Sequence, residues 1–331
     1  MIATEKWPVP KRRLKLGFVG GGRGALVGEW HAMGARMSNR WDIVAGALSS
    51  RPDIAKASGE DWMLDPQRAY ASFEDMAAKE AAREDGIDAV AICTPNGHHF
   101  ANAEAFLKAG IGVICDKPMT VTMDEAKALI DLVEETGLFC GVTYTYSFHA
   151  MIRQARAMIA KGMLGKVRQA HVEYVQDWAT GAEDPTTKQA SWRRDPKQAG
   201  RGSVTGDIGT HAFHLLHFVL DKPITELSAR FHVCGGADQM EDTAFMQLKV
   251  DGDIPGTLWA TQAAPGNACG LRLRIYGDKG GLEWEHQDPN QMTFTRFGEP
   301  KQILTRGGAN IGPDWTRVPP GHPEGYLEGF A

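Results

Sequence analysis

The chain has 331 residues, of which 43% are hydrophobic and 23% are charged, and its formal net charge is -5. This composition is that of an ordinary globular protein, with room for roughly two domains. The lack of a basic excess argues against nucleic acid or an anionic membrane surface as a partner. No apolar run approaches the ~20 residues that cross a bilayer. Residues 1–13 lack the apolar core of a signal peptide, so we expect a cytoplasmic protein.

The cysteines are isolated from one another in the sequence, and none forms a C-x-x-C pair. Three of them lie in or beside segments that we expect to be buried strands. This pattern favours reduced core thiols over disulfides or a zinc site. The five positions are Cys93, Cys115, Cys140, Cys234 and Cys269.

A glycine-rich turn follows the first expected strand, residues 14–19. Gly20, Gly22 and Ala25 fit the dinucleotide fingerprint G-x-G-x-x-G/A. In that motif the first two glycines allow a tight turn and close approach of the backbone to a pyrophosphate, and the small third residue lets helix and strand pack closely. The turn, which also contains Arg23, is therefore a candidate cofactor site. The alternative is a glycine-rich turn that holds no ligand.

A helix should follow this turn, with its large apolar side chains on one side at helical spacing. These side chains are Leu26, Val27, Trp30, Met33 and Met37.

The second expected strand, residues 42–48, leads into Ser49, Ser50 and Arg51. NAD-specific sites usually place an acidic residue near this strand end to bind the ribose 2′-hydroxyl, whereas an arginine can meet a 2′-phosphate. The nearest acid here is Asp53, which lies past a proline. The three residues are candidates for contact with the cofactor, and the pattern favours NADP or the use of both cofactors. Alternatively, Arg51 is a solvated loop charge.

Polar residues also follow the next strand, residues 88–93. The chain continues as Thr94-Pro95-Asn96, with His98 and His99 shortly after. Open α/β sheets bind ligands at the carboxyl ends of their strands, so this is a candidate ligand loop, and we include His99 among the cofactor contacts. The alternative is that one of the two histidines caps the following helix, residues 100–109.

The strand at residues 111–115 ends in Asp116-Lys117-Pro118, which the rigid sheet would hold at the same crevice. Thr122 and Glu125 form a capping box that opens a helix to Thr136. With a further helix at residues 73–82, strands and helices alternate throughout this part of the chain. The alternation predicts a parallel, doubly wound sheet, and we assign residues 1–146 to this domain.

Residues 147–331 have a different pattern and should form a second domain. A helix around residues 151–160 and a strand at 167–175 precede runs in which apolar and polar residues alternate. Such alternation is typical of an antiparallel sheet with one covered face and one wetter face, and the wetter face is a candidate oligomer interface. The apolar positions are Leu227, Ala229, Phe231 and Val233, then Ala244, Met246, Leu248 and Val250, then Leu271, Leu273 and Ile275.

A second cluster of polar residues lies within this domain and opens a helix. Asp207 and His211 are four residues apart, so on a helix they share a face. A carboxylate beside an imidazole can orient it and raise its basicity, as a general base near neutral pH requires. The alternative is an aspartate at a helix start and a structural core histidine. Asp207, His211 and His214 could also bind a metal, but His217 would point away from Asp207, and we expect no metal site.

Together these motifs resemble one family, and the resemblance covers nearly the whole chain. The residues that carry it are Val19-Gly20-Gly21-Gly22, Cys93-Thr94-Pro95-Asn96, Asp116-Lys117-Pro118, Trp192-Arg193 and Gly206-Asp207-Ile208-Gly209-Thr210-His211. They are similar to motifs of the glucose–fructose oxidoreductase, inositol dehydrogenase and rhizopine-catabolism (Gfo/Idh/MocA) family. That family usually has glutamate at the position of Asp116, and often three glycines where this chain has Gly200-Arg201-Gly202. Its chains typically continue past Ala331 into a last helix, so we expect the sequence to be part of a longer chain.

The resemblance implies an N-terminal Rossmann domain and a C-terminal α/β domain with an open, largely antiparallel sheet, through which members form homodimers or homotetramers. It implies reversible oxidation of a sugar, inositol or related polyol hydroxyl with NAD or NADP. Thr94, Pro95 and Asn96 should line the nicotinamide half of the cofactor. Trp192 and Arg193 should border the same cleft.

The resemblance also implies catalytic roles. Lys117 corresponds to the substrate lysine of the family, and Asp207 and His211 correspond to its polar catalytic pair. We expect His211 to take the hydroxyl proton, Lys117 to stabilise negative charge on the substrate oxygen, and Asp207 to orient His211 or hold a neighbouring hydroxyl.

Two functions of other classes remain as alternatives. A non-catalytic dinucleotide-binding sensor would keep the glycine turn but would not need Lys117, Asp207 and His211 together. A metal-dependent hydrolase or lyase would use the helix of His211 and would contain stoichiometric metal. A third possibility stays within the fold, in which the cofactor is retained while one sugar is oxidised and another is reduced.

Overall fold

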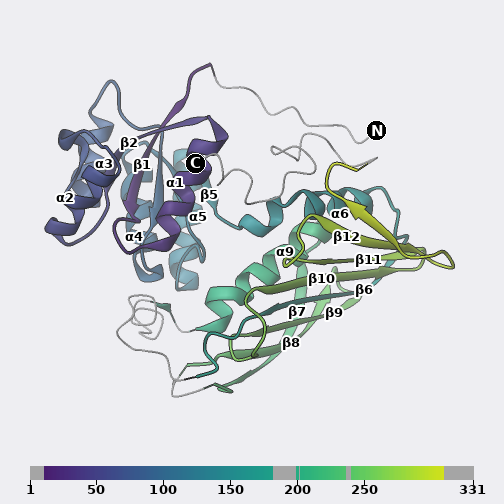
Figure 1. Ribbon diagram of the computed structural model, residues 1–331. Coiled ribbons are helices and arrows are strands. Elements are labelled where there is room, and N and C mark those ends of the chain that lie inside the picture. The colour runs from purple at the N-terminus through teal and green to yellow at the C-terminus, as the bar shows by residue number, and fades with distance from the viewer. Residues whose placement is uncertain (1–10, 182–198, 201, 236–239, 309–331) are drawn as a thin grey trace. The chain divides into compact units, whose positions relative to one another are not determined.

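The computed structural model describes residues 11–181, 199–200, 202–235 and 240–308. Within these ranges the chain packs as two units, each with its own sheet and hydrophobic core (Figure 1). The first unit contains residues 11–143 and 199–200, and the second contains the remaining described residues. The domain assignment made from the sequence stays a prediction, since both of its outer ends lie outside these ranges.

The first unit is built on a five-stranded parallel sheet with the strand order β2-β1-β3-β4-β5, which confirms the predicted doubly wound architecture. Strands β1 and β3 lie inside the sheet and are almost wholly apolar, as strands buried on both faces must be. The strands are β1 (Leu14–Gly20), β2 (Trp41–Ala47), β3 (Ala89–Cys93), β4 (Gly112–Cys115) and β5 (Cys140–Val142).

Helices cover both faces of this sheet. Met76 of α3 and Phe106 of α4 pack on Val90 and Ile92 of β3. Ala32 of α1 belongs to a second cluster, which is formed by the strand residues between these and lies on the other face of the sheet. A change of face with each successive strand residue is the expected consequence of the two-residue period of a strand. The helices are α1 (Leu26–Ser38), α2 (Pro52–Asp61), α3 (Phe73–Ala81), α4 (His99–Lys108) and α5 (Met123–Thr136).

Helix α1 is present where the sequence predicts it, but its large apolar side chains are not the ones that pack. Gly28, Ala32 and Ala35 are buried instead. The helix lies close to the sheet, so only small residues fit between them, and the side with the large apolar residues is not the side that packs on the sheet. Leu26, Trp30, Met33 and Met37 are between 47% and 61% exposed.

Helix α5 has the predicted ends. Thr122 Oγ1 accepts from the Glu125 N–H, the Glu125 carboxylate accepts from the Thr122 N–H, and Gly137 closes the helix in the left-handed region at φ 64°. The capping box is therefore confirmed, and it fixes the chain directly after the Asp116-Lys117-Pro118 turn.

The second unit is built on an eight-stranded, mostly antiparallel sheet with the order β13-β12-β11-β10-β6-β9-β8-β7, and only β6 and β9 pair in parallel. This confirms the predicted open sheet. The strands are β6 (Val167–Val175), β7 (Ile224–His232), β8 (Thr243–Val250), β9 (Ile254–Thr261), β10 (Gly270–Gly277), β11 (Gly280–Glu285), β12 (Gln291–Arg296) and β13 (Gln302–Thr305).

Two helices, α6 (Ala150–Ala160) and α9 (Thr210–Leu220), pack on one face of this sheet (Figure 1). Met151 of α6 and Leu215 of α9 are fully buried against Val172, Leu258 and other inward-facing strand residues. The other face is open and has both polar and aromatic side chains. It carries ion pairs of Glu173 with arginines of β10.

The predicted alternation holds in β8 and β10, whose apolar residues Ala244, Leu248 and Leu273 are buried. It fails in β7, where Leu227 is 58% and Phe231 is 56% exposed. Strand β7 lies at the edge of the sheet, beyond β9 and β6, against which α9 packs. The pattern predicts which side of a strand is apolar, but it does not predict how far a helix extends over that side.

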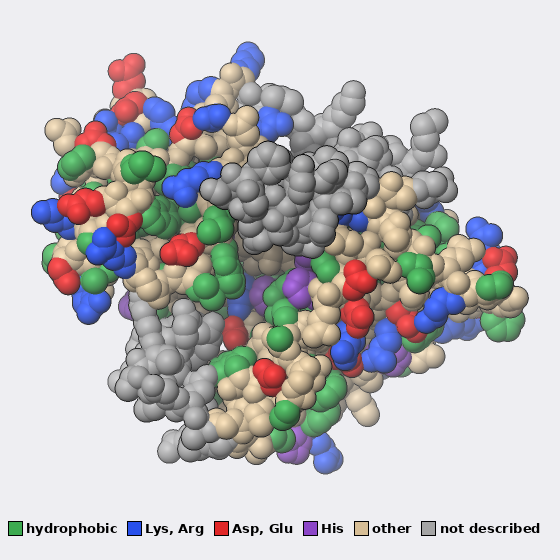
Figure 2. Space-filling view, viewed as in Figure 1, with side chains coloured by type: hydrophobic (Ala, Val, Ile, Leu, Met, Phe, Trp, Pro, Cys, Tyr) green, Lys and Arg blue, Asp and Glu red, His purple; other side chains and the backbone are tan. Residues whose placement is uncertain are grey.

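No helix among the described residues is long and apolar enough to cross a membrane. On the face of the molecule in Figure 2, acidic and basic side chains are mixed, with no large area of one sign. This distribution agrees with the small net charge of -5.

Candidate active site

The turn after β1 is built as the fingerprint requires. Gly20 and Gly21 have positive φ angles of 73° and 81°, which side-chain-bearing residues rarely adopt. The Gly22 N–H donates to the Leu48 carbonyl oxygen at 3.1 Å, which ties the turn to the end of β2. A Cβ atom on Gly22 would lie 2.5 Å from Ser58 Oγ and 2.7 Å from that carbonyl oxygen. The turn therefore needs glycine at this position.

Helix α1 approaches this turn at Gly28, where a Cβ atom would lie 2.3 Å from the Gly21 Cα. The residue that permits close packing of helix and turn is thus Gly28, whereas Ala25 precedes the first helical residue and donates its N–H to the Gly22 carbonyl oxygen at 2.9 Å. Sequence reasoning missed Gly28. A glycine inside a helix lowers the stability of that helix, so its presence in the predicted helix was an available signal that another segment packs closely there. The N–H groups at the start of α1 follow the turn directly, which fits the pyrophosphate of a dinucleotide.

The candidate ribose residues lie where β2 leads into α2. Ser49 Oγ accepts from the Arg51 N–H at 3.2 Å, and Ser50 and Arg51 are exposed. On the neighbouring turn, the Arg23 guanidinium donates to Asp61, at the end of α2, through Nε at 2.5 Å and Nη2 at 2.8 Å. This hydrogen bond lowers the pKa of the Asp61 carboxyl. Arg23 is therefore already engaged with a carboxylate of the same unit.

His99 connects two of the predicted ligand loops. Its Nδ1 lies 2.7 Å from the Pro118 carbonyl oxygen and its Nε2 lies 2.9 Å from the Thr94 carbonyl oxygen, and the side chain is completely buried. The buried ring lies between the two loops and supports both of them, and its predicted contact with a cofactor stays a prediction. In the alternative, one of the two histidines caps the helix. His98 occupies the N-cap position of α4 but makes no side-chain cap bond, and His99 is the first residue of the helix.

The Thr94-Pro95-Asn96 loop is held by further side-chain bonds. Asn102 of α4 donates to Thr94 Oγ1 at 3.1 Å, and the amide of Asn96 donates to the Ala199 carbonyl oxygen at 3.1 Å. Asn96 is buried and Thr94 is partly buried. The loop is thus a fixed surface at the carboxyl end of β3, as the sequence predicts for a ligand loop.

Asp116 is largely buried, and its neighbour is a histidine that the sequence did not indicate. His31 of α1 places its Nε2 3.7 Å from Asp116 Oδ1. Burial alone would raise the pKa of Asp116, but the nearby His31 ring and the charge of Lys117 outweigh it and lower that pKa. The carboxylate is thus charged beside Lys117.

The predicted pair Asp207 and His211 lies in the second unit. Asp207 belongs to a π-helical turn, Thr205–Gly209, that leads into α9, so the α-helix begins three residues later than the aspartate. Gln262, directly after β9, donates through Nε2 to Asp207 Oδ2 at 2.9 Å and fixes the carboxylate. His211 is buried, with 8% of its surface exposed.

Three tyrosines surround the His211 ring. The ring centroids of Tyr144, Tyr146 and Tyr174 lie 5.6, 4.8 and 6.2 Å from that of His211. Sequence reasoning missed all three. For Tyr144 and Tyr146, the available signal was two polar aromatic residues close after the last strand of the first unit. Tyr174 could not be found in this way, because its inward position in β6 is revealed only by how the strands pair.

The hydroxyl groups of this cluster are linked behind His211. Tyr146 and Tyr174 lie 2.6 Å apart at their hydroxyl oxygens, and the Tyr174 hydroxyl lies 3.2 Å from Cys269 Sγ. Burial raises the pKa of both tyrosines, and the nearby Asp207 carboxylate adds to the shift of Tyr146. Both phenols therefore stay neutral near pH 7. Their rings pack against the His211 ring.

His214 is not oriented as a partner of His211. Its ring stacks on Tyr144 at 4.0 Å between centroids, and its Nδ1 lies 2.9 Å from Ser147 Oγ. Burial lowers the pKa of His214 to about 4. His217 is directed elsewhere, with Nδ1 2.8 Å from the Lys222 carbonyl oxygen. Within the described ranges no group of three His, Cys, Asp or Glu side chains is placed to hold a metal ion.

The predicted catalytic residues thus come from two separately packed units. Lys117 belongs to the first unit, and Asp207 and His211 belong to the second, where both lie next to Tyr146. Trp192 and Arg193 lie outside the described residues. All five cysteines are free thiols, but only Cys115 is fully buried and Cys234 is exposed, so the prediction of core thiols does not hold for every one of them.

Comparisons with known proteins agree with this architecture. Residues 14–144 match the oxidoreductase family with an NAD-binding Rossmann fold, and residues 152–283 match the GFO/IDH/MocA C-terminal domain. The uncharacterised oxidoreductase YfiI of Bacillus subtilis is 37% identical over 298 residues, which span 89% of this chain and 76% of that protein.

Solved structures are also similar to this chain. An oxidoreductase from Sinorhizobium meliloti is 45% identical, with a TM-score of 0.85 over 97% of this chain and 86% of that one. An inositol dehydrogenase homolog from Azotobacter vinelandii, complexed with NAD+, is 34% identical, with a TM-score of 0.91 over 97% of this chain and 84% of that one. The same homolog complexed with NADH and myo-inositol has a TM-score of 0.88, also at 34% identity, over 97% of this chain and 83% of that one.

The fold, the glycine turn and these matches define an NAD-binding oxidoreductase. The chain belongs to the Gfo/Idh/MocA family, in both its NAD-binding and its C-terminal parts.

Proposed function

We propose that this protein is an NAD(P)-dependent dehydrogenase that oxidises, reversibly, a CH–OH group of a sugar, an inositol or a related polyol. The observation that carries the proposal is the buried His211 imidazole, which lies among three tyrosines and follows, four residues on, the Asp207 carboxylate that Gln262 holds in place. A structural core histidine would not need that fixed acid. The homolog complexed with NADH and myo-inositol supports the substrate class.

The first unit provides the cofactor site. The glycine turn and the start of α1 hold the pyrophosphate, Ser49 to Arg51 face the adenosine ribose, and the Thr94-Pro95-Asn96 loop lines the nicotinamide half. Asp116 and Lys117 end the next strand at the same edge of the sheet. When bound, the nicotinamide ring supplies a site that accepts or donates a hydride.

The second unit provides the acid–base groups. His211 accepts the proton of the substrate hydroxyl as that hydroxyl becomes a carbonyl. Asp207 stabilises the imidazolium that forms, or holds a neighbouring substrate hydroxyl. Lys117, from the first unit, donates to the reacting oxygen and stabilises its negative charge. Tyr144 and Tyr146 fix the plane of the imidazole through ring contacts, so little reorientation precedes proton transfer.

The test is a fluorescence titration of the purified protein with NADH and with NADPH, followed by a panel of sugars and polyols with the nucleotide that binds. Micromolar binding, together with reduction of the oxidised cofactor by a member of the panel, is the expected result. Binding without turnover of any member would favour a non-catalytic sensor. Failure of both nucleotides to bind, together with stoichiometric metal in the protein, would favour a metal-dependent hydrolase or lyase. Turnover without release of reduced cofactor would indicate a retained cofactor.

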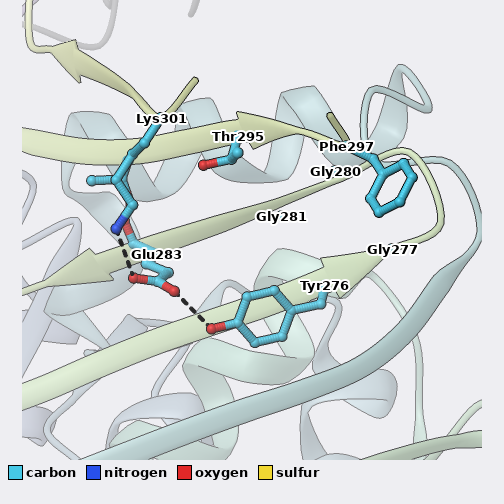
Figure 3. Close-up of a pocket in the computed structure, with 9 residues that line it drawn as sticks. Tyr276, Gly277, Gly280, Gly281, Glu283, Thr295, Phe297 and Lys301 are labelled. Atoms are coloured by element: carbon cyan, nitrogen blue, oxygen red, sulfur yellow. Dashed lines mark hydrogen bonds and ion pairs between the residues drawn. The ribbon is translucent and has the colours of Figure 1, made fainter. Parts of the chain in front are cut away.

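We further propose that the chain forms a homodimer or homotetramer through the open face of the eight-stranded sheet. That face carries the stacked pair Phe245 and Trp259, 6.0 Å apart at the ring centroids. It also has a depression of about 290 Å³ floored by glycines of β10 and β11, next to Tyr276 and the 88% exposed Phe297 (Figure 3). Phe245→Glu should convert the oligomer to monomer in light scattering coupled to gel filtration. An unchanged mass would count against this face.

A further inference from the structure

The contact between Arg23 and Asp61 is a feature of the cofactor unit that the proposed reaction does not use. Arg23 lies within the glycine turn, directly after Gly22. Its guanidinium donates two parallel hydrogen bonds to the Asp61 carboxylate, and its backbone N–H donates to Ser58 Oγ at 3.0 Å. Both partners belong to α2, so this helix fixes where the Arg23 side chain points.

This position matters because α2 begins where the cofactor ribose must lie. In a Rossmann fold the ribose 2′ position faces the end of β2, and an arginine nearby accommodates a 2′-phosphate. The hydrogen bond from Gly22 to Leu48 brings the glycine turn against that strand end. Arg51 lies at this strand end, at the N-cap of α2, whereas the Arg23 guanidinium extends from the adjoining turn to Asp61, the last residue of α2.

The ion pair with Asp61 limits the ability of Arg23 to bind a phosphate group. A guanidinium paired bidentately with a carboxylate has its charge neutralised and its donors directed away from other acceptors. The bond geometry is that of a strong pair, but both side chains are about half exposed, at 52% and 46%. A doubly charged phosphate group can compete for an exposed pair of this kind, because solvent already screens the attraction within it.

We propose that Asp61 is a specificity-determining residue for the cofactor: by holding Arg23, it suppresses the preference for NADPH that Arg23 and Arg51 would otherwise create. This inference rests on the proposed function, since it assumes that the glycine turn binds NAD(P). It assigns the choice between the two cofactors to the far end of α2, outside the strand-end residues Ser49 to Arg51.

The experiment measures Kd for NADH and for NADPH by fluorescence titration in four proteins: the wild type, Asp61→Asn, Arg23→Met and the double variant. Asp61→Asn removes one negative charge while preserving shape, and should raise the NADPH-to-NADH affinity ratio about three- to tenfold at 0.1 M salt. In the Arg23→Met background the same substitution should change the ratio less than about twofold, because Asp61 acts through Arg23.

Asp75→Asn is the matched control. It removes an exposed carboxylate that also pairs with a basic side chain, Lys79, elsewhere in the unit, and it should leave the ratio unchanged. An unchanged ratio in Asp61→Asn would overturn the inference, as would an equal rise with and without Arg23. Failure of both nucleotides to bind the wild type would instead reject the proposed function itself. A general loss of stability would weaken the binding of both cofactors equally, so it would leave the NADPH-to-NADH affinity ratio unchanged.

Discussion

The imidazole of His99 lies 2.7 Å from the carbonyl oxygen of Pro118, and its other nitrogen lies 2.9 Å from that of Thr94. One fully buried side chain thus connects the loops that follow β3 and β4, which carry the candidate nicotinamide contacts and Lys117. Burial lowers the pKa of His99, so in the neutral ring only one of the two nitrogens carries a hydrogen and donates to its carbonyl group. Its role is to set the spacing of these loops.

We expect His99→Ala to loosen both loops. The substitution leaves two carbonyl groups without their partner and creates a cavity, which should lower the free energy of unfolding by about 2–4 kcal/mol. The Kd for NADH should rise several-fold. Urea unfolding and fluorescence titration measure the two effects. His98→Ala is the control, because that neighbouring side chain is exposed. A variant with wild-type stability and affinity would contradict the role of His99.

For His211→Ala we expect turnover to fall by about a hundred- to ten-thousand-fold, the usual contribution of general-base catalysis. The Kd for NADH should stay within about twofold of the wild-type value, because His211 belongs to the other unit. Steady-state kinetics and titration separate the two quantities. His217→Ala, on the same helix with its ring bonded to a carbonyl oxygen, should keep full turnover. If His211→Ala retains the wild-type rate, His211 is not the base.

Lys117→Met tests the electrostatic role of the lysine. Methionine preserves much of the side-chain volume and removes the charge, so a loss of turnover reports the missing stabilisation of the substrate oxygen. We expect turnover to fall at least about a hundredfold, comparable to the loss of one donor to a developing oxyanion. The rate at saturating substrate is the decisive measurement. A change confined to KM would assign Lys117 to binding alone.

A buried ion pair supports the cofactor unit. Glu80 of α3 is completely buried and accepts hydrogen bonds from Arg68, from Tyr70 at 2.7 Å and from the Ile87 N–H at 3.2 Å. Arg68→Met leaves this carboxylate without its counter-charge and should lower the free energy of unfolding by about 3–5 kcal/mol. Adding Glu80→Gln should recover part of the loss. Arg83→Met, which removes a more exposed partner of Asp85, should leave the unfolding free energy close to that of the wild type.

The sequence predicts the fold well because its signals are local. Glycines in the turn after β1, the capping box at Thr122 and the two-residue alternation of β10 each report their own surroundings. The predictions that fail depend on what packs from a distance. The exposed Trp30 and Phe231 are apolar residues at regular spacing, but which side of a helix or strand another element covers is decided by tertiary packing.

The candidate site follows the same division. Asp207 and His211 are recognisable from their spacing, whereas Gln262, which fixes Asp207, follows β9, a strand far along the chain. Tyr174 contacts His211 only because β6 is an inner strand of the sheet. Partners separated by 28 to 95 residues, such as Tyr146 with Tyr174 and Tyr174 with Cys269, leave no local pattern in the sequence.

The stability of the second unit should depend on pH through His214. Burial lowers the pKa of this histidine to about 4, against about 6.5 in an unfolded chain. Between these values the unfolded chain binds the proton and the folded chain does not, so the free energy of unfolding falls as the pH decreases from 6.5 to 4. Since the ring is only half buried, we expect a loss of about 1–2 kcal/mol, below the value that the full shift would give.

The measurement is urea unfolding of the wild type and of His214→Asn at pH 7, 5.5 and 4.5. Asparagine retains a polar group near Ser147 but does not titrate, so the difference between the two proteins isolates His214 from all other titrating groups. The wild type should lose more stability than the variant as the pH falls. Parallel curves would show that the folded and unfolded chains protonate His214 alike, and the stacked contact with Tyr144 would then have no influence on its proton affinity.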